Sequence, residues 1–368
     1  GVRIMAYTNI DDPSAHFQVA TWSGTGSSNA VTFDGNSDMQ PDLVWSKRRD
    51  VGYNHVLKTT SIGGTSDNDI HLVPNLGNAK STYSNYRMDF NSDGFTADAQ
   101  GDQGFNASGS SMVSWCWKAN GGTTSSNTDG SLTSTVQANT TAGFSILTYT
   151  GDNTAAQTIG HGLGAVPQLI IVKRTNSNNR NWAVYHANSR ASSPEDVYGR
   201  LDTADGFEDN AAYWNDTAPT SSVFTVGTGN NSRVNSGDLL ALCFTEKQGY
   251  SKFGDYYGTN HVDGQFVYTG FKPAFVVLKL AEASTGGSWA IFDNKRSDVV
   301  GANQIDKEIA ANEDTAEYDR TNANMDFLSN GFKLRNTDGW HNTVANFVFF
   351  AFAEQPFVTS TGIPTTAR

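Results

Sequence analysis

Short apolar runs separated by polar turns set the pattern of this chain. The runs are rich in Val, Ile, Leu and Phe, and Gly, Asn and Asp bound them on either side. This pattern is typical of β-strands joined by hairpin turns. In the middle of the chain it predicts strands at residues 143–150, 167–174, 181–187, 222–227 and 238–246. Helix is expected to be minor, limited to short turns near residues 194–198 and 302–309.

One phrase of this pattern occurs three times. A proline opens an apolar strand that ends in a lysine, and this happens in residues 41–47, 167–173 and 273–279. Other landmarks keep nearly the same offsets between copies: Trp22, Tyr149 and Tyr256; Phe95, Phe224 and Phe332; and Cys116, Cys243 and Ala351. Nearly constant offsets of this kind indicate an internal repeat.

A repeat with this many antiparallel strands needs a second layer, because a single sheet would leave an apolar face in water. The sequence therefore predicts an all-β protein made of three tandem jelly-roll-like or lectin-like β-sandwich repeats. The expected divisions are an N-terminal arm at 1–15, repeats at 16–119, 142–247 and 248–357, a linker with an edge strand at 120–141, and a C-terminal tail at 358–368.

The segments between the repeats predict how the repeats move relative to one another. Residues 120–130 are rich in Gly, Ser, Thr and Asn, so the first repeat is expected to be hinged. Only residues 247–252 separate the second and third repeats, which are expected to sit rigidly together. The two ends lack a core pattern, and we expect neighbours in an assembly to hold them.

Composition narrows the classes of partner. Asp and Glu number 37 and Lys and Arg 25, which gives a formal net charge of −12. Nucleic acid is not an expected partner, since a protein that binds phosphates needs a positive field. No apolar run reaches the roughly 18 residues of a membrane helix, so membrane insertion is not expected either. The first residues lack the apolar core of a signal peptide, so general secretion is not expected.

Candidate catalytic and metal-binding patterns are sparse. Seven histidines are scattered without metal-ligand spacing, and no Gly-x-Ser-x-Gly motif is present, so we predict no catalytic residues. Cys116 and Cys243 stand at matching positions of different repeats, which predicts two free, buried thiols. No cofactor is expected, with calcium as the one alternative. Asp34, Asn36 and Asp38 offer oxygen atoms at alternate positions, but the Gly and Glu of a complete calcium loop are missing.

The aromatic residues divide into two groups. Trp115, Trp117, Trp182 and Trp289 fall on predicted strands at matching positions of the repeat and are expected in the core. Tyr213, Trp214 and Trp340 lie in loop-like contexts beside Asn, Asp and Arg. Exposed rings flanked by amides and carboxylates are suited to binding sugars and equally to protein interfaces. These three residues are therefore the candidate ligand-binding residues.

Five segments carry a resemblance to a known family: residues 5–15, 33–38, 217–227, 266–275 and 362–368. In them, and over nearly its whole length, the chain resembles an uncharacterised family of tail-fibre-like virion proteins from tailed marine bacteriophages. The resemblance implies a place on the virion surface, on the tail or the capsid exterior. It brings no catalytic residues, and it would make Met5 the natural first residue.

These observations favour a non-enzymatic virion structural protein, a tail fibre or surface appendage, that serves assembly and host attachment. A capsid decoration protein, a glycan-binding receptor-binding module and a polysaccharide depolymerase are the alternatives. The expected partners are other virion proteins, further copies of the chain and a host cell-surface glycan. Phage fibres are often trimers, so the resemblance implies a homo-oligomer of that kind.

Overall fold

The computed structural model describes residues 6–63, 68–84, 86–99, 104–154, 156–190, 192–228, 234–282, 286–297, 303–320 and 324–365. Within these ranges the protein is all-β. Helix is limited to α1 (Ala211–Trp214) and the 3-10 turns η1 (Pro13–Ala15) and η2 (Pro194–Asp196). The sheets of the described residues are antiparallel, and none of them closes into a barrel.

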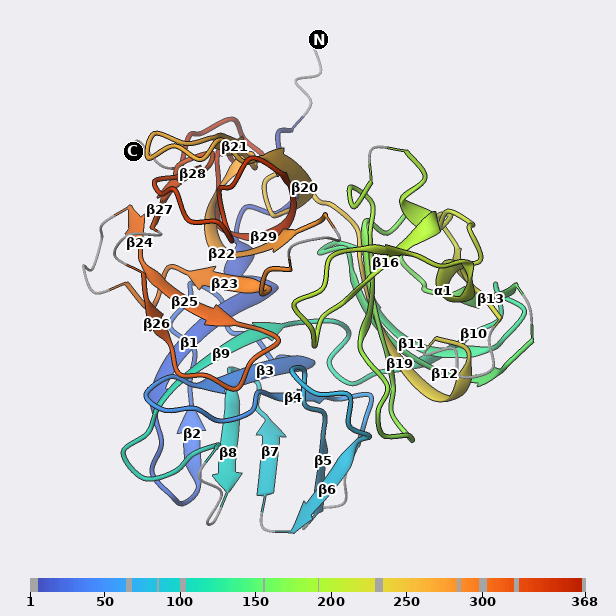
Figure 1. Ribbon diagram of the computed structural model, residues 1–368. Coiled ribbons are helices and arrows are strands. Elements are labelled where there is room, and N and C mark those ends of the chain that lie inside the picture. Colours follow the sequence, from blue (N-terminus) through green and yellow to red (C-terminus); the bar gives the residue numbers. More distant parts are fainter. Residues whose placement is uncertain are drawn as a thin grey trace.

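Three large sheets form the body of the molecule (Figure 1). The first, in sheet order, contains β1 (Phe17–Ser23), β9 (Ser111–Trp117), β3 (Leu43–Arg48) and β4 (Val56–Thr59). The second contains β10 (Ser125–Asn127), β11 (Ser134–Asn139), β12 (Phe144–Asp152), β19 (Ser236–Phe244), β14 (Leu169–Arg174), β15 (Ala183–His186), β16 (Val197–Arg200) and β17 (Glu208–Asp209). The third contains β20 (Ser251–Tyr257), β29 (Asn346–Pro356), β22 (Phe271–Leu280), β23 (Ala290–Asp293), β25 (Lys307–Ala310) and β26 (Tyr318–Asp319).

Smaller sheets accompany the large ones. One contains β2 (Asn29–Val31), β8 (Phe95–Ala99) and β7 (Tyr86–Phe90), and another pairs β5 (Asn68–His71) with β6 (Ser81–Ser84). A third pairs β13 (Gln157–Gly160) with β18 (Val223–Val226). The last contains β21 (Phe266–Tyr268), β28 (Gly331–Leu334), β27 (Met325–Leu328) and β24 (Gln304–Ile305).

A central strand in each large sheet pairs with its two neighbours in the same register. These central strands are β9, β19 and β29. The residues at one matching position and their two partners are Cys116 with Gln18 and Val44, Cys243 with Ser145 and Ile170, and Ala351 with Lys252 and Val276. The residues that the sequence spacing groups together thus occupy matching positions in the three sheets.

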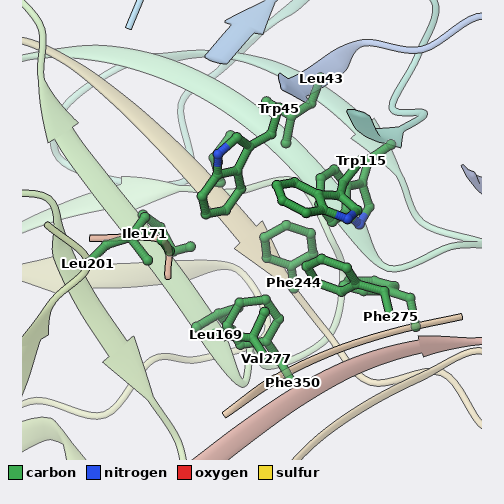
Figure 2. Close-up of a cluster of buried hydrophobic side chains, with 14 of the residues drawn as sticks. Leu43, Trp45, Trp115, Leu169, Ile171, Leu201, Phe244, Phe275, Val277 and Phe350 are labelled. Carbon is green, nitrogen blue, oxygen red and sulfur yellow. The ribbon is translucent and has the colours of Figure 1, made fainter. Parts of the chain in front are cut away.

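One face of each large sheet is buried in a single core that all three sheets share. Figure 2 shows side chains of this core pointing toward one another from the three sheets. The Trp115 ring of the first sheet lies 5.8 Å from the Phe275 ring of the third, and Trp117 lies 6.5 Å from Phe244 of the second. The three parts of the chain therefore meet around common aromatic residues, and the four tryptophans predicted in the core are confirmed there.

The prediction of a hinge after the first repeat is wrong, because the first sheet shares its core with the other two. Residues of the first sheet are packed into the shared core, so this part of the chain cannot swing away from the rest. The predicted flexible linker is also anchored. The Asp42 carboxylate accepts hydrogen bonds from the backbone amides of Gly121 and Gly122, at 2.9 and 2.6 Å.

The second face of each large sheet is buried separately beneath smaller strands. Leu169 and Ile171 of β14 point into the shared core, whereas Ile170 and Val172 point into an outer cluster with residues of β13 and β18. Successive side chains of a strand point to opposite faces. A strand with both faces buried therefore needs a continuous apolar run, which is the pattern the sequence shows.

Buried tryptophans form hydrogen bonds that join the second large sheet to the first part of the chain and the third large sheet to the second. Trp182 Nε1 of the second sheet donates to the carbonyl of Val73 in the first part of the chain, at 3.2 Å. Trp289 Nε1 of the third sheet donates to the carbonyl of Arg200 in the second, at 2.7 Å. These bonds satisfy buried indole nitrogens and fix the sheets against one another.

His55 makes the corresponding bond between the first and third parts of the chain. Its Nδ1 accepts from Trp45 Nε1 at 2.9 Å, so Nε2 carries the proton and donates to the carbonyl of Ala310 at 3.1 Å. Burial lowers the pKa of His55 to about 3, which keeps the ring neutral. Together with the two tryptophans, His55 closes a ring of bonds around the three sheets.

The structure also bears on the predicted helical turn, the cysteines and the two ends. Residues 303–309 form β24 and most of β25 and not a helical turn, because pairing with neighbouring strands overrides local propensity. Both cysteines are free and buried, as predicted. In the described part of the two ends, Ile10 lies in the shared core, and the backbone amide of Ser360 donates to Asp11 Oδ1 at 2.6 Å. In the described residues, no helix is long and apolar enough to cross a membrane.

Candidate binding site around Trp340

Trp340 lies in the loop between β28 and β29 and is 46% exposed. Side-chain turns fix this loop. Asn336 Oδ1 accepts from the backbone amide of Asp338 at 2.9 Å, and Asp338 Oδ1 accepts from that of Trp340 at 2.7 Å. Asn and Asp favour such turns because their short side chains bond to the backbone two residues on. The exposed indole is thus carried by an ordered loop.

A buried ion network supports the loop from below. His341 is fully buried, with Nδ1 3.1 Å from Asp338 Oδ1 and Nε2 3.2 Å from Glu308 Oε2. Glu308 comes from β25, is also fully buried, and lies 3.0 Å from Arg320 Nε. The Arg320 guanidinium stacks on the Trp340 ring at 5.6 Å. Trp340 is therefore held at two points: Asp338 binds its backbone amide, and Arg320 covers one face of its ring.

The network shifts the protonation of its members. Burial by itself would lower the pKa of His341, but the charges of Glu308 and Asp338 raise that pKa to about 9. The close contact with the His341 ring lowers the pKa of Asp338 to about 2. His341 is therefore charged at neutral pH, and two cations balance two carboxylates. Buried ion pairs seldom add net stability, and perturbed pKa values cluster at functional sites.

A second loop lies against the first and carries further exposed apolar residues. Asn342 joins the two loops, because its Oδ1 accepts from the backbone amide of Thr259 at 2.9 Å and its Nδ2 donates to the carbonyl of His261 at 2.9 Å. The exposed apolar side chains on the two loops and at the adjoining end of β20 are Tyr257, Val262, Trp340 and Val344. We call this set the Trp340 platform.

Charged groups flank the platform. The mostly exposed carboxylate of Asp263 pairs with Lys333 at 2.6 Å and with Arg335 at 3.1 Å. Asp338 and Arg320 are partly exposed beside the indole. A half-exposed aromatic ring with hydrogen-bonding groups of both kinds at its edge can stack against an apolar ring face and bind hydroxyl groups around it.

Two of the three predicted ligand-binding aromatics lie elsewhere and are buried. Tyr213 and Trp214 belong to α1, where Tyr213 stacks on Tyr198 with ring centroids 3.5 Å apart. Neither ring offers a face to a ligand, so the prediction for these two residues is corrected. Their polar neighbours have another role, because Asn210 caps the start of α1 and Asn215 ends it in the left-handed conformation.

The candidate calcium ligands lie outside the large sheets. Asp34, Asn36 and Asp38 lie on an exposed loop, and Asp34 pairs with Lys295 at 2.8 Å. In the described part of the chain, no group of three or more His, Cys, Asp or Glu side chains could hold a metal ion.

Little in the sequence indicated the ion network. Glu308, Arg320 and His341 are far apart in the chain and only the fold brings them together. The closeness of Asp338, Trp340 and His341 along the chain was the one available signal, since an acidic residue, a ring and an imidazole then share one turn.

The comparisons with known proteins place the chain in a family. Neither a curated protein nor a solved structure matches it significantly. Residues 12–356 match a family described as a domain of unknown function, DUF7483. Because this match spans most of its length, the chain belongs to the DUF7483 family.

Proposed function

We propose that this protein is a non-catalytic virion structural protein that attaches to host cell-surface carbohydrate through the Trp340 platform. The observation that carries the binding role is the half-exposed Trp340 indole, held by an ordered loop over a buried ion network. Through Asp338 and Arg320, the network fixes both the loop backbone and one face of the ring.

The burial of Glu308 and His341 favours a positioning role for them over a catalytic one. An acid or base must come within hydrogen-bonding reach of its substrate. Glu308 and His341 are fully buried and already paired with one another, so they can orient Trp340 but cannot touch a bound sugar. This supports an attachment protein in preference to a depolymerase.

We also infer that the chain consists of three copies of one β-sandwich-like unit. The matching registers of β9, β19 and β29 support this, as do the bonds made by His55, Trp182 and Trp289. The virion location, on tail or capsid, rests on the sequence resemblance alone, and so do a trimeric assembly and contacts with other virion proteins. Antibodies against the chain, imaged on purified particles, would test the location.

The binding proposal is tested with a glycan array followed by titration of the best ligand in solution. We expect Trp340→Ala to weaken binding at least about tenfold, which corresponds to the roughly 1.4 kcal/mol of one good contact. Val166→Ala is the control, because it truncates an apolar side chain that is exposed to a similar extent and lies outside the platform. Absence of binding to any glycan, or equal binding by Trp340→Ala and wild type, would refute the proposal.

A further inference from the structure

A groove of about 440 Å³ follows the outer edge of β20, where the second and third large sheets meet. β20 and β21 supply most of its walls, and residues at the ends of second-sheet strands and Phe349 of β29 supply the rest. Its lining includes Gln168, Asn188, Lys252, Asp255, Phe266 and Tyr268. Among the described strands, none pairs with this outer edge of β20.

The backbone of β20 faces alternately toward β29 and toward the groove. Hydrogen bonds of 2.8 and 2.9 Å join Tyr250 and Gly258, the residues that flank β20, to the β29 side. In an antiparallel ladder, every second residue bonds to the same neighbour. Phe253 and Asp255 therefore direct their N–H and C=O groups into the groove, as an edge strand that can accept another strand does.

The matching edge in the second sheet shows what such a groove can hold. The common register matches Phe253 and Asp255 of β20 with Ile146 and Thr148 of β12. Over its full length, β11 lies antiparallel against β12 and pairs with this edge. The edge that is open in the third sheet is thus covered by a strand in the second.

β11 also contacts the two other walls of its site. Ser134 Oγ donates to the carbonyl of Gly160 in β13 at 2.6 Å. The buried side chain of Gln137 reaches the first part of the chain, where its Nε2 donates to Thr60 Oγ1 at 2.9 Å. β11 therefore lies between β12, β13 and the preceding sheet. The β20 groove has corresponding walls, formed by β20, β21 and the ends of second-sheet strands.

The matching edge of the first sheet is covered in another way. The loop at residues 34–37 lies over the start of β1, where Gln18 Oε1 accepts from the backbone amide of Gly35 and Gln18 Nε2 donates to the carbonyl of Ser37, each at 3.0 Å. The groove beside β1 is about 210 Å³, half the size of the one beside β20. Of the three matching edges, that of β20 has the most room.

We propose that the β20 groove binds an extended peptide segment of a partner chain, which adds an antiparallel strand to β20. The segment resembles β11 in chemistry, with small apolar side chains alternating with hydroxyl and amide side chains. Its backbone bonds to Phe253 and Asp255, and an amide at the position of Gln137 faces Gln168 and Asn188. The interaction is independent of carbohydrate binding at the Trp340 platform.

The test uses the full-length protein and a labelled synthetic peptide with the sequence of residues 131–141, followed by fluorescence anisotropy. We expect saturable binding. Asp255→Pro is expected to weaken it at least about tenfold, because proline removes an N–H that faces the groove and leaves the β29 ladder intact. Asp255→Ala is the matched control, since it removes the carboxylate and keeps the N–H, and it is expected to bind within about threefold of wild type.

A second comparison leaves the protein unchanged. In the peptide, Thr135→Pro removes the N–H opposite the position of Asp255, and we expect the same loss of binding. Trp340→Ala should bind the peptide like wild type, which separates this proposal from the carbohydrate site. Failure of the unmodified peptide to bind, or equal binding of the peptide with and without proline, would overturn the proposal. The proposal would also fail if an oligosaccharide displaced the peptide and Phe266→Ala no longer bound that oligosaccharide. The groove would then be a carbohydrate site.

Discussion

The buried network beneath Trp340 predicts a specific dependence of stability on pH. Burial lowers the pKa of an imidazole, yet Glu308 and Asp338 raise that of His341 to about 9. A histidine in an unfolded chain titrates near 6.5, and one pKa unit corresponds to 1.36 kcal/mol, so the shift is worth roughly 3 kcal/mol of folding free energy. Because folding raises the pKa, this contribution is complete below about pH 6.5 and is lost as the pH rises through about 9.

The reference protein is the double variant His341→Gln with Glu308→Gln, which removes the pair without leaving a buried carboxylate unpaired. We expect the free energy of unfolding of wild type, relative to this variant, to fall by about 3 kcal/mol between about pH 6 and pH 10. Guanidinium unfolding followed by circular dichroism measures it. The subtraction cancels groups common to both proteins, such as Lys47 and Lys279, for which burial lowers the pKa to about 8 and about 7. A difference that stays constant over this range would show that His341 is not charged in the native protein.

Three further predictions concern the shared core and its surroundings. Trp289→Phe should lower the free energy of unfolding by about 2 kcal/mol or more in denaturant titrations, since it leaves a buried carbonyl without its donor and creates a cavity; a loss no larger than that in Trp340→Phe would contradict this. Asp293→Asn should cost about 3 kcal/mol by the same measurement, because buried Arg296 loses one of its carboxylate partners, and near-neutrality would refute it. Cys116 and Cys243 should resist a thiol reagent until the protein unfolds, since burial raises the pKa of both thiols; rapid labelling of native protein would contradict their burial.

Local pattern was enough to predict five strands of the middle repeat, four in the second large sheet and one in the small sheet that covers it. The strands predicted in the middle of the chain coincide closely with β12, β14, β15, β18 and β19. The offsets that grouped Cys116, Cys243 and Ala351 reappear as matching registers. Apolar runs report burial on both faces of a strand, but not what the faces pack against. The single core shared by the three sheets could therefore not be predicted from the sequence pattern.

The candidate site shows the same limit at the level of single residues. Trp214 and Trp340 have similar polar neighbours in sequence, yet one is buried in α1 and the other is half-exposed. The neighbours of Trp214 cap a helix, and those of Trp340 fix a loop over Glu308 and His341. Composition around a ring does not distinguish these cases, because the difference arises from contacts between distant parts of the chain.

The most direct test of the proposed function is a crystal structure of the protein soaked with the glycan that it binds best. If the Trp340 platform binds the glycan, electron density for a sugar ring will lie against the exposed face of Trp340, with hydroxyl groups toward the charged side chains at the edge of the platform. Glycan density elsewhere, with the Trp340 ring left free, would contradict it.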